Sequence, residues 1–171
     1  MNDNSELMPN ETLGQNEILV GERLYSDAIN IVLANAHHEL LIFDQDLTHG
    51  DFISVQKYEL LREFLSKDIN SRLTIILQNT TFFQEKCPRL VSLLTVYGHK
   101  MTIYETNDSA KHAKDCFVLA DDKHYIKRIH IDQARFKYAL DDPASVDVLN
   151  LRFNELLEAT HHMVTITKLG L

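Results

Sequence analysis

The sequence has no tryptophan, only five glycines and three prolines, and no apolar run of the roughly 18 residues that a membrane-spanning helix needs. Gly50 and Gly98 stand alone, which excludes the glycine-rich phosphate loops of Rossmann and Walker-type nucleotide sites. Residues 1–17 are acidic and polar, without the basic start and apolar stretch of a secretory signal. We therefore expect a cytoplasmic protein without a membrane segment, with a disordered lead-in over residues 1–17 and a single domain over residues 18–171.

Cysteine is nearly absent. The only two, Cys87 and Cys116, are far apart in the sequence, and no Cys-x-x-Cys or His-x-x-x-His spacing occurs. Free thiols in a reducing compartment are the simplest interpretation. We expect no metal site and no cofactor.

Positive charge is scarce and unevenly distributed. The net charge is −8, which makes a nucleic-acid partner unlikely. Residues 111–137 nevertheless carry seven Lys or Arg against four Asp, a balance of +3 that leaves −11 for the rest. This segment predicts a local surface for an anionic or phosphate-bearing ligand.

Apolar periodicity predicts a regular alternation of helices and strands in the first half of the chain. We expect helices over residues 21–36, 54–66 and from Pro88 to Gly98, each followed by an apolar strand, over 39–44, 72–78 and 99–104. This α-β-α-β-α-β order is typical of a parallel sheet flanked by helices.

The second half changes pattern. Strand-like runs over 115–121, 125–131 and 135–140 are separated by short polar turns and predict antiparallel hairpins. A helix capped by Asp142, with Pro143 at its first position, should run to about Thr160, and residues 163–167 could add an edge strand. The predicted class is α/β with a mixed sheet.

Two groups of polar residues are candidates for a binding site. Arg128 and His130 share one face of a predicted strand, and Arg135 and Lys137 alternate with aromatic residues on the next, so these four could converge on an anion. An amphipathic hairpin with one solvated face would give the same pattern. Asp44 and Asp46 follow a predicted parallel strand, where ligands of such sheets gather, although turns and caps also explain them.

Residues 111–122 read KHAKDCFVLADD and place His112 and Lys114 just before an apolar strand that ends at Asp121. With the order of elements, this resembles the His-x-Lys and Asp signature of the phospholipase D superfamily, over roughly residues 21–160. The chain is also similar to bacterial proteins of unknown function with a degenerate phospholipase D-like domain. The resemblance implies that two units pair, here as a homodimer. It also implies a histidine that attacks a phosphodiester, a lysine that holds the phosphate and an aspartate that orients a histidine.

The spacing departs from that signature in either register. If His112 and Lys114 match the family's histidine and lysine, the aspartate position falls on Leu119. If the match is made at Asp121, the histidine position falls on Lys114 and the lysine position on Cys116. A two-residue slip moves a group by about 7 Å along a strand, which a nucleophile and its phosphate clamp do not tolerate. His112, Lys114 and Asp121 are thus candidates only, and catalysis is not expected.

Three hypotheses follow. The leading one is a catalytically degenerate phospholipase D-like domain that acts as a binding or accessory module. The second is a divergent phosphodiesterase that uses His112 and Lys114 with a repositioned acid, Asp115 or Asp121. The third is a small-molecule-binding α/β domain with its pocket near Asp44 and Asp46.

Overall fold

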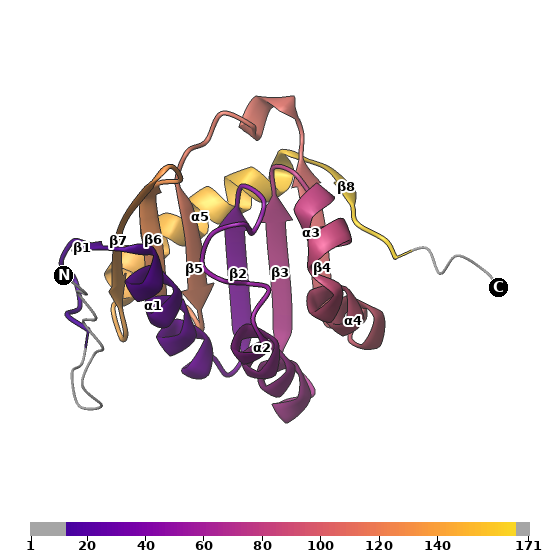
Figure 1. Ribbon diagram of the computed structural model, residues 1–171, viewed down its shortest axis with the longest axis horizontal. Helices are drawn as coiled ribbons and strands as arrows, with labels where there is room; N and C mark the ends of the chain where they lie inside the picture. The colour runs from indigo at the N-terminus through magenta and orange to yellow at the C-terminus, as the bar shows by residue number, and fades with distance from the viewer. Residues whose placement is uncertain (1–12, 167–171) are drawn as a thin grey trace, which may run out of the picture.

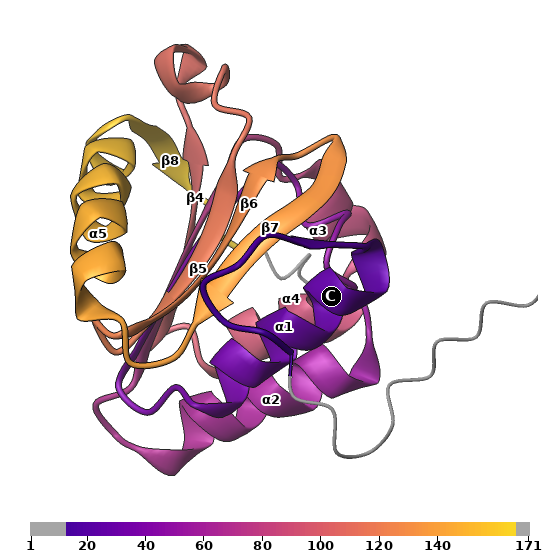
Figure 2. The ribbon, with the colours of Figure 1, turned by 90° about the vertical axis from the view of Figure 1, so that its left-hand side faces the viewer.

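The computed structural model describes residues 13–166, in which eight strands form one mixed sheet with helices on both faces (Figures 1 and 2). β2, β3 and β4 are parallel neighbours, and every other pairing is antiparallel. From one edge to the other the strands are β1 (Leu19–Val20), β7 (Gln133–Ala139), β6 (His124–His130), β5 (Cys116–Ala120), β2 (Glu39–Asp44), β3 (Arg72–Leu77), β4 (Met101–Thr106) and β8 (Thr160–Met163). The predicted fold class, a parallel first half followed by antiparallel strands, is confirmed.

Helices cover the two faces unequally. α1, α2 and α4 lie on one face, and the C-terminal α5 lies alone on the other (Figure 2). Among residues 13–166, no helix is long and apolar enough to cross a membrane. The helices are α1 (Glu22–Ala34), α2 (Val55–Lys67), α3 (Thr81–Lys86), α4 (Pro88–Val96) and α5 (Pro143–Glu158), with one 3-10 turn, η1 (Asp108–Ala110).

Two helix starts follow directly from the sequence. The carboxylate of Asp142 accepts a hydrogen bond from the amide of Ser145 at 3.2 Å, and Pro143 occupies the first turn of α5, as predicted. The Ser54 hydroxyl accepts in the same way from the Lys57 amide at 3.1 Å and fixes the start of α2.

The sheet separates two apolar cores. Alternate residues of β2 divide between them: Leu40 and Ile42 join the larger core under α1, α2 and α4, while Phe43 joins the smaller core under α5. A strand buried on both faces explains why the β2 sequence is almost continuously apolar. Cys87 and Cys116 are free thiols within the larger core, as the sequence predicts.

The structure has a helix that the sequence pattern does not predict. Six residues, Thr81–Lys86, form α3 directly before α4. Pro88 has no amide hydrogen to continue a helix from Thr81, so α4 begins afresh there. A six-residue helix is also too short to show the apolar spacing that identified the others.

Part of the predicted lead-in is packed against the sheet. Residues 1–12 lie outside the described residues, but Leu13 is buried, and its carbonyl oxygen accepts a hydrogen bond from the Tyr138 hydroxyl at 2.5 Å. The Asn16 amide donates to the Tyr138 carbonyl at 2.9 Å. Residues 13–17 therefore belong to the ordered domain and lead into β1.

Candidate functional site

The candidate site is the edge of the sheet where β2, β3 and β4 end and β5 begins, which we call the rim. A loop of residues 107–115 rises above it (Figure 1). The side-chain amide nitrogen Nε2 of Gln78, directly after β3, donates to the carbonyl oxygens of Ala110 and Ala113 at 3.1 and 2.8 Å. These bonds hold the loop over the strand ends, where open α/β sheets bind their ligands.

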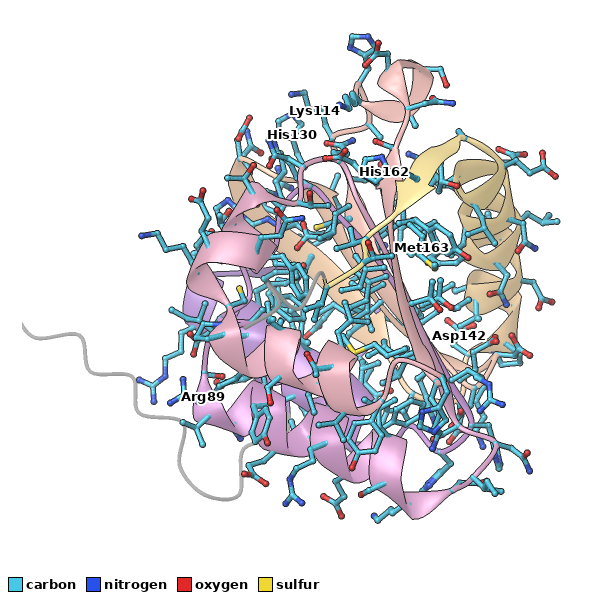
Figure 3. The ribbon with its side chains drawn as sticks, turned by 90° about the vertical axis from the view of Figure 1, so that its right-hand side faces the viewer. Arg89, Lys114, His130, Asp142, His162 and Met163 are labelled. Atoms are coloured by element: carbon cyan, nitrogen blue, oxygen red, sulfur yellow. The ribbon has the colours of Figure 1, made fainter. Side chains whose placement is uncertain are left out.

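Two basic residues lie next to each other at the rim. The Ile131 amide donates to the Lys114 carbonyl at 2.6 Å, which fixes the start of β5 beside the end of β6. Figure 3 shows Lys114 and His130 next to each other at this edge. The Asp132 amide donates to Nδ1 of His130 at 3.2 Å, so the ring proton is assigned to Nε2. No residue within 13–166 makes a hydrogen bond or ion pair with that Nε2 or with the Lys114 ammonium.

His112 does not join this pair in a catalytic arrangement. It is exposed in the loop, and no residue of the described chain makes a hydrogen bond or ion pair with its imidazole. A histidine nucleophile needs a partner that orients the ring and sets its tautomer. The structure supplies none for His112 within one chain.

Asp121 lies at the opposite end of β5 from Lys114. Six residues lie between the two, which corresponds to roughly 20 Å along an extended chain. The Asp121 carboxylate accepts hydrogen bonds from the backbone amides of His37, His38 and Glu39 at 2.7, 2.7 and 2.9 Å. Burial acts to raise the pKa of this carboxyl, but the three amides outweigh it and hold the pKa below its usual value. Its role is to cap the start of β2.

Replacing Asp121 with alanine should lower the free energy of unfolding by about 2 kcal/mol, because three charge-assisted hydrogen bonds are lost where water can partly replace them. Asp122→Ala is the matched control. Both residues have a positive φ, 55° and 58°, but Asp122 accepts one exposed bond, from Asn150. Urea denaturation of both variants measures the difference, and equal losses would contradict the capping role.

The four predicted anion-binding residues do not converge. Arg128 pairs in register with Phe136, so its side chain points toward α1, where it is fully buried. Lys137 pairs with Lys127, which places it on the other face, and Arg135 shares that face. Only His130 lies at the rim with Lys114. The amphipathic alternative weighed for this hairpin describes β7, whose solvated face carries Arg135 and Lys137.

The buried Arg128 has a carboxylate partner that sequence reasoning missed. Its guanidinium makes two hydrogen bonds to the Glu22 carboxylate, at 2.8 and 2.7 Å, and lies 4.9 Å from the centre of the Tyr25 ring. The hydrogen bonds that Arg128 donates lower the pKa of Glu22 below its usual value. Glu22 opens α1, 106 residues earlier in the chain, so no local pattern connects the pair.

Three neighbouring strands present a row of buried polar groups beside this pair. Asp44 follows Phe43, which pairs with Phe117, so Asp44 lies across from Cys116, and Cys116 lies across from Arg128. The Tyr25 hydroxyl is 3.4 Å from the Cys116 sulfur. Burial raises the pKa of Asp44 from 3.8 to about 7. Asp44 was expected at an open rim but is only 3% exposed.

The pocket hypothesis at Asp44 and Asp46 gains no support from this geometry. Asp44 accepts a hydrogen bond from the Gln45 amide at 2.7 Å beneath the loop that follows β2. Asp46 accepts from the amide and hydroxyl of Thr48 at 3.0 and 2.7 Å. Both carboxylates thus serve the loop itself. Within residues 13–166, no group of three or more potential metal ligands gathers.

Solved structures of the phospholipase D class share this fold. Nuc from Salmonella typhimurium, a phospholipase D family member, superimposes with a TM-score of 0.56 at 7% identity, over 85% of this chain and 96% of that one. NucT from Helicobacter pylori gives a TM-score of 0.50 at 14% identity, over 84% of this chain and 96% of that one. At these identities the likeness concerns the fold alone.

An archaeal chromatin protein, TrmBL2, whose structure shows a novel mode of DNA binding, is also similar. Its TM-score is 0.64 at 14% identity, over 91% of this chain. This chain spans 56% of TrmBL2, little more than half of its length.

By sequence, the chain belongs to the family described as Domain of unknown function (DUF7931), which matches residues 23–169. No curated protein sequence matches it. The homodimer inferred from the phospholipase D resemblance stays a prediction.

Proposed function

We propose that this domain is a non-catalytic binding module that takes a phosphate-bearing ligand at the rim. The observation that carries the proposal is the adjacency of Lys114 and His130, which leaves an ammonium and an imidazole Nε2 free to donate to one anion (Figure 3). The pair lies at the edge of the sheet where open α/β sheets bind ligands, which supports the proposal.

The positions of the other motif residues support a non-catalytic role. Covalent phosphodiester cleavage requires the nucleophile, the phosphate clamp and the acid to converge on one reacting atom. The Asp121 carboxylate accepts hydrogen bonds from three backbone amides at the far end of β5. When the family signature is matched at Asp121, the clamping lysine position falls on Cys116, which is buried and whose pKa burial raises well above its usual value.

Calorimetric titration with pyrophosphate tests the binding site. Lys114→Ala and His130→Ala should each weaken the affinity about fivefold to tenfold, because each removes one charge-assisted or neutral hydrogen bond to the phosphate, a contribution of about 1–1.4 kcal/mol. Lys123→Ala is the matched control, since this exposed lysine lies in the turn at the other end of β5.

Unchanged affinity in both rim variants, or an equal loss in Lys123→Ala, would contradict the assignment of the ligand to the rim. Hydrolysis of a phosphodiester that disappears in His112→Ala would instead support the divergent phosphodiesterase. The two outcomes are independent, because binding is measured with pyrophosphate and turnover with a diester.

A further inference from the structure

A second surface, which differs from the rim in combining exposed apolar and basic side chains, lies on the outer side of the β6–β7 hairpin. α5 packs over β4, β5 and β6, and this leaves the neighbouring face of β7 open beside it (Figure 2). The register places Lys127 opposite Lys137, and Arg135 opposite Val20 of β1, all on this side. We call it the hairpin face, defined by Val20, Lys127, Ile129, Arg135, Lys137 and Val148.

The two lysines of the hairpin face repel each other, and no partner among the described residues offsets this repulsion. Like charges directly opposite on antiparallel strands are destabilising. No residue within 13–166 forms a hydrogen bond or an ion pair with the ammonium of Lys127 or Lys137, nor with the guanidinium of Arg135. Three unpaired cations thus gather on a chain whose net charge is −8. An anionic partner would relieve this repulsion.

Exposed apolar side chains accompany these cations. Val148 is 67% exposed, Val20 64% and Ile129 45%. Exposed apolar residues are usually scattered singly over a surface, whereas these three lie on one face. Ile129 and Val148 border a groove of about 400 Å³ between the hairpin and α5, and its lining also includes Tyr125 and Leu149. None of the residues that line the groove is acidic. The groove therefore combines apolar side chains with the basic side chains of Lys127 and Lys137.

We propose that the hairpin face binds an acidic, leucine-rich or similarly apolar segment of a partner protein. Apolar side chains of that segment would enter the groove between Ile129 and Val148, and its carboxylates would reach Lys127, Lys137 and Arg135. Its acidity follows from charge complementarity with three unpaired cations.

Two other occupants fit the same observations less well. A second copy that docks by the same face would bring each set of three cations against its own symmetry mate. An anionic bilayer is flat and is repelled by a net charge of −8, whereas this surface is a groove. A segment of polypeptide matches both the concavity and the charge.

The test uses the full chain and two fluorescent peptides of about 14 residues, each with leucine at helical spacing and either glutamate or lysine at all other positions. We expect fluorescence anisotropy to show binding of the glutamate peptide only. The double variant Lys127→Glu/Lys137→Glu should weaken this binding about tenfold or more. Lys67→Glu/Lys86→Glu makes the same charge change on exposed lysines of α2 and α3, on the other side of the sheet, and should leave it unchanged.

Val148→Asp provides a second variant, since an exposed helical position tolerates the change and the groove loses an apolar wall. It should weaken binding of the glutamate peptide as well. Equal binding of the two peptides, or no effect of the Lys127 and Lys137 changes, would overturn the proposal. So would a dimer in sedimentation that Val148→Asp dissociates, or binding to phosphatidylserine vesicles without peptide binding.

Discussion

Replacing Asp44 with asparagine is expected to stabilise the protein by roughly 4 kcal/mol at about pH 8 and to change its stability little at about pH 4. Asp44 is 3% exposed, and burial raises the pKa of its carboxyl from 3.8 to about 7, with the nearby Asp46 acting in the same direction. The backbone amides of Gln45 and Leu47 oppose this shift without cancelling it. Asparagine retains the size and the acceptor for the Gln45 amide but never ionises.

The direction of the change in stability with pH follows from the raised pKa of Asp44 in the folded state. Well below pH 3.8 the carboxyl is neutral in both the folded and the unfolded chain, so it adds no penalty. Between pH 3.8 and about 7 the Asp44 carboxyl is ionised in the unfolded chain but still protonated in the folded chain, so stability falls as the pH rises. Above that window the loss levels off, and a shift of this size at 1.36 kcal/mol per pH unit amounts to roughly 4 kcal/mol.

Guanidinium denaturation of both proteins at several pH values across this window measures the effect. Asp44→Ala separates charge from packing, because it removes the charge, the hydrogen bond to Gln45 and the side-chain volume together. It should be less stable than Asp44→Asn at every pH. An asparagine variant that is less stable than the native protein at about pH 8 would contradict the raised pKa of the buried Asp44 carboxyl.

Glu22→Gln should destabilise the protein by about 2–3 kcal/mol at neutral pH, because it leaves the fully buried Arg128 without a counter-charge. Loss of one partner from a fully buried pair typically costs about 3–5 kcal/mol. Here the Glu22 side chain is 53% exposed, so water relieves part of the loss. The lowered pKa of Glu22 means that its contribution is present at neutral pH and is lost as the pH falls through that pKa.

Glu59→Gln is the matched control, since Glu59 also accepts two guanidinium hydrogen bonds, from Arg62, but on the exposed surface of α2. It should cost less than about 0.5 kcal/mol. The double variant Glu22→Gln/Arg128→Met removes both charges and should recover most of the loss. Equal effects of Glu22→Gln and Glu59→Gln in urea denaturation would show that burial of Arg128 does not matter.

The strands were predictable because the apolar composition that produces them lies within each short segment of sequence. A central strand buried on both faces must be apolar throughout, and Glu39–Asp44 was predicted with its observed bounds. α1 was placed nearly correctly, but the helical spacing of Leu24, Ala28, Ile31 and Val32 does not give its buried face. Ala28 and Val32 are buried, whereas Leu24 and Ile31 are only partly buried and Tyr25 is buried in addition. The spacing of apolar residues fixes a helix more firmly than it fixes which of two adjacent stripes meets the sheet.

The candidate site was less accessible to sequence reasoning because it depends on register. Arg128 and Lys137 were expected to act together, but the pairing of Arg128 with Phe136 sends them to opposite faces. A shift of one residue in that pairing would have reversed the outcome. The Lys114–His130 pair was missed for a related reason: it forms only because the start of β5 meets the end of β6. Residues that are far apart in the sequence become neighbours in this way only once the pairing of the strands is known.

Phosphorus NMR of bis(p-nitrophenyl) phosphate mixed with the full chain tests the central claim most directly, because one spectrum reports both binding and cleavage. The account predicts a broadened or shifted diester resonance, weaker in Lys114→Ala than in Lys123→Ala, with no monoester product on long incubation. A monoester resonance that grows with time and is absent in His112→Ala would contradict it. So would a diester resonance that the native protein leaves unchanged.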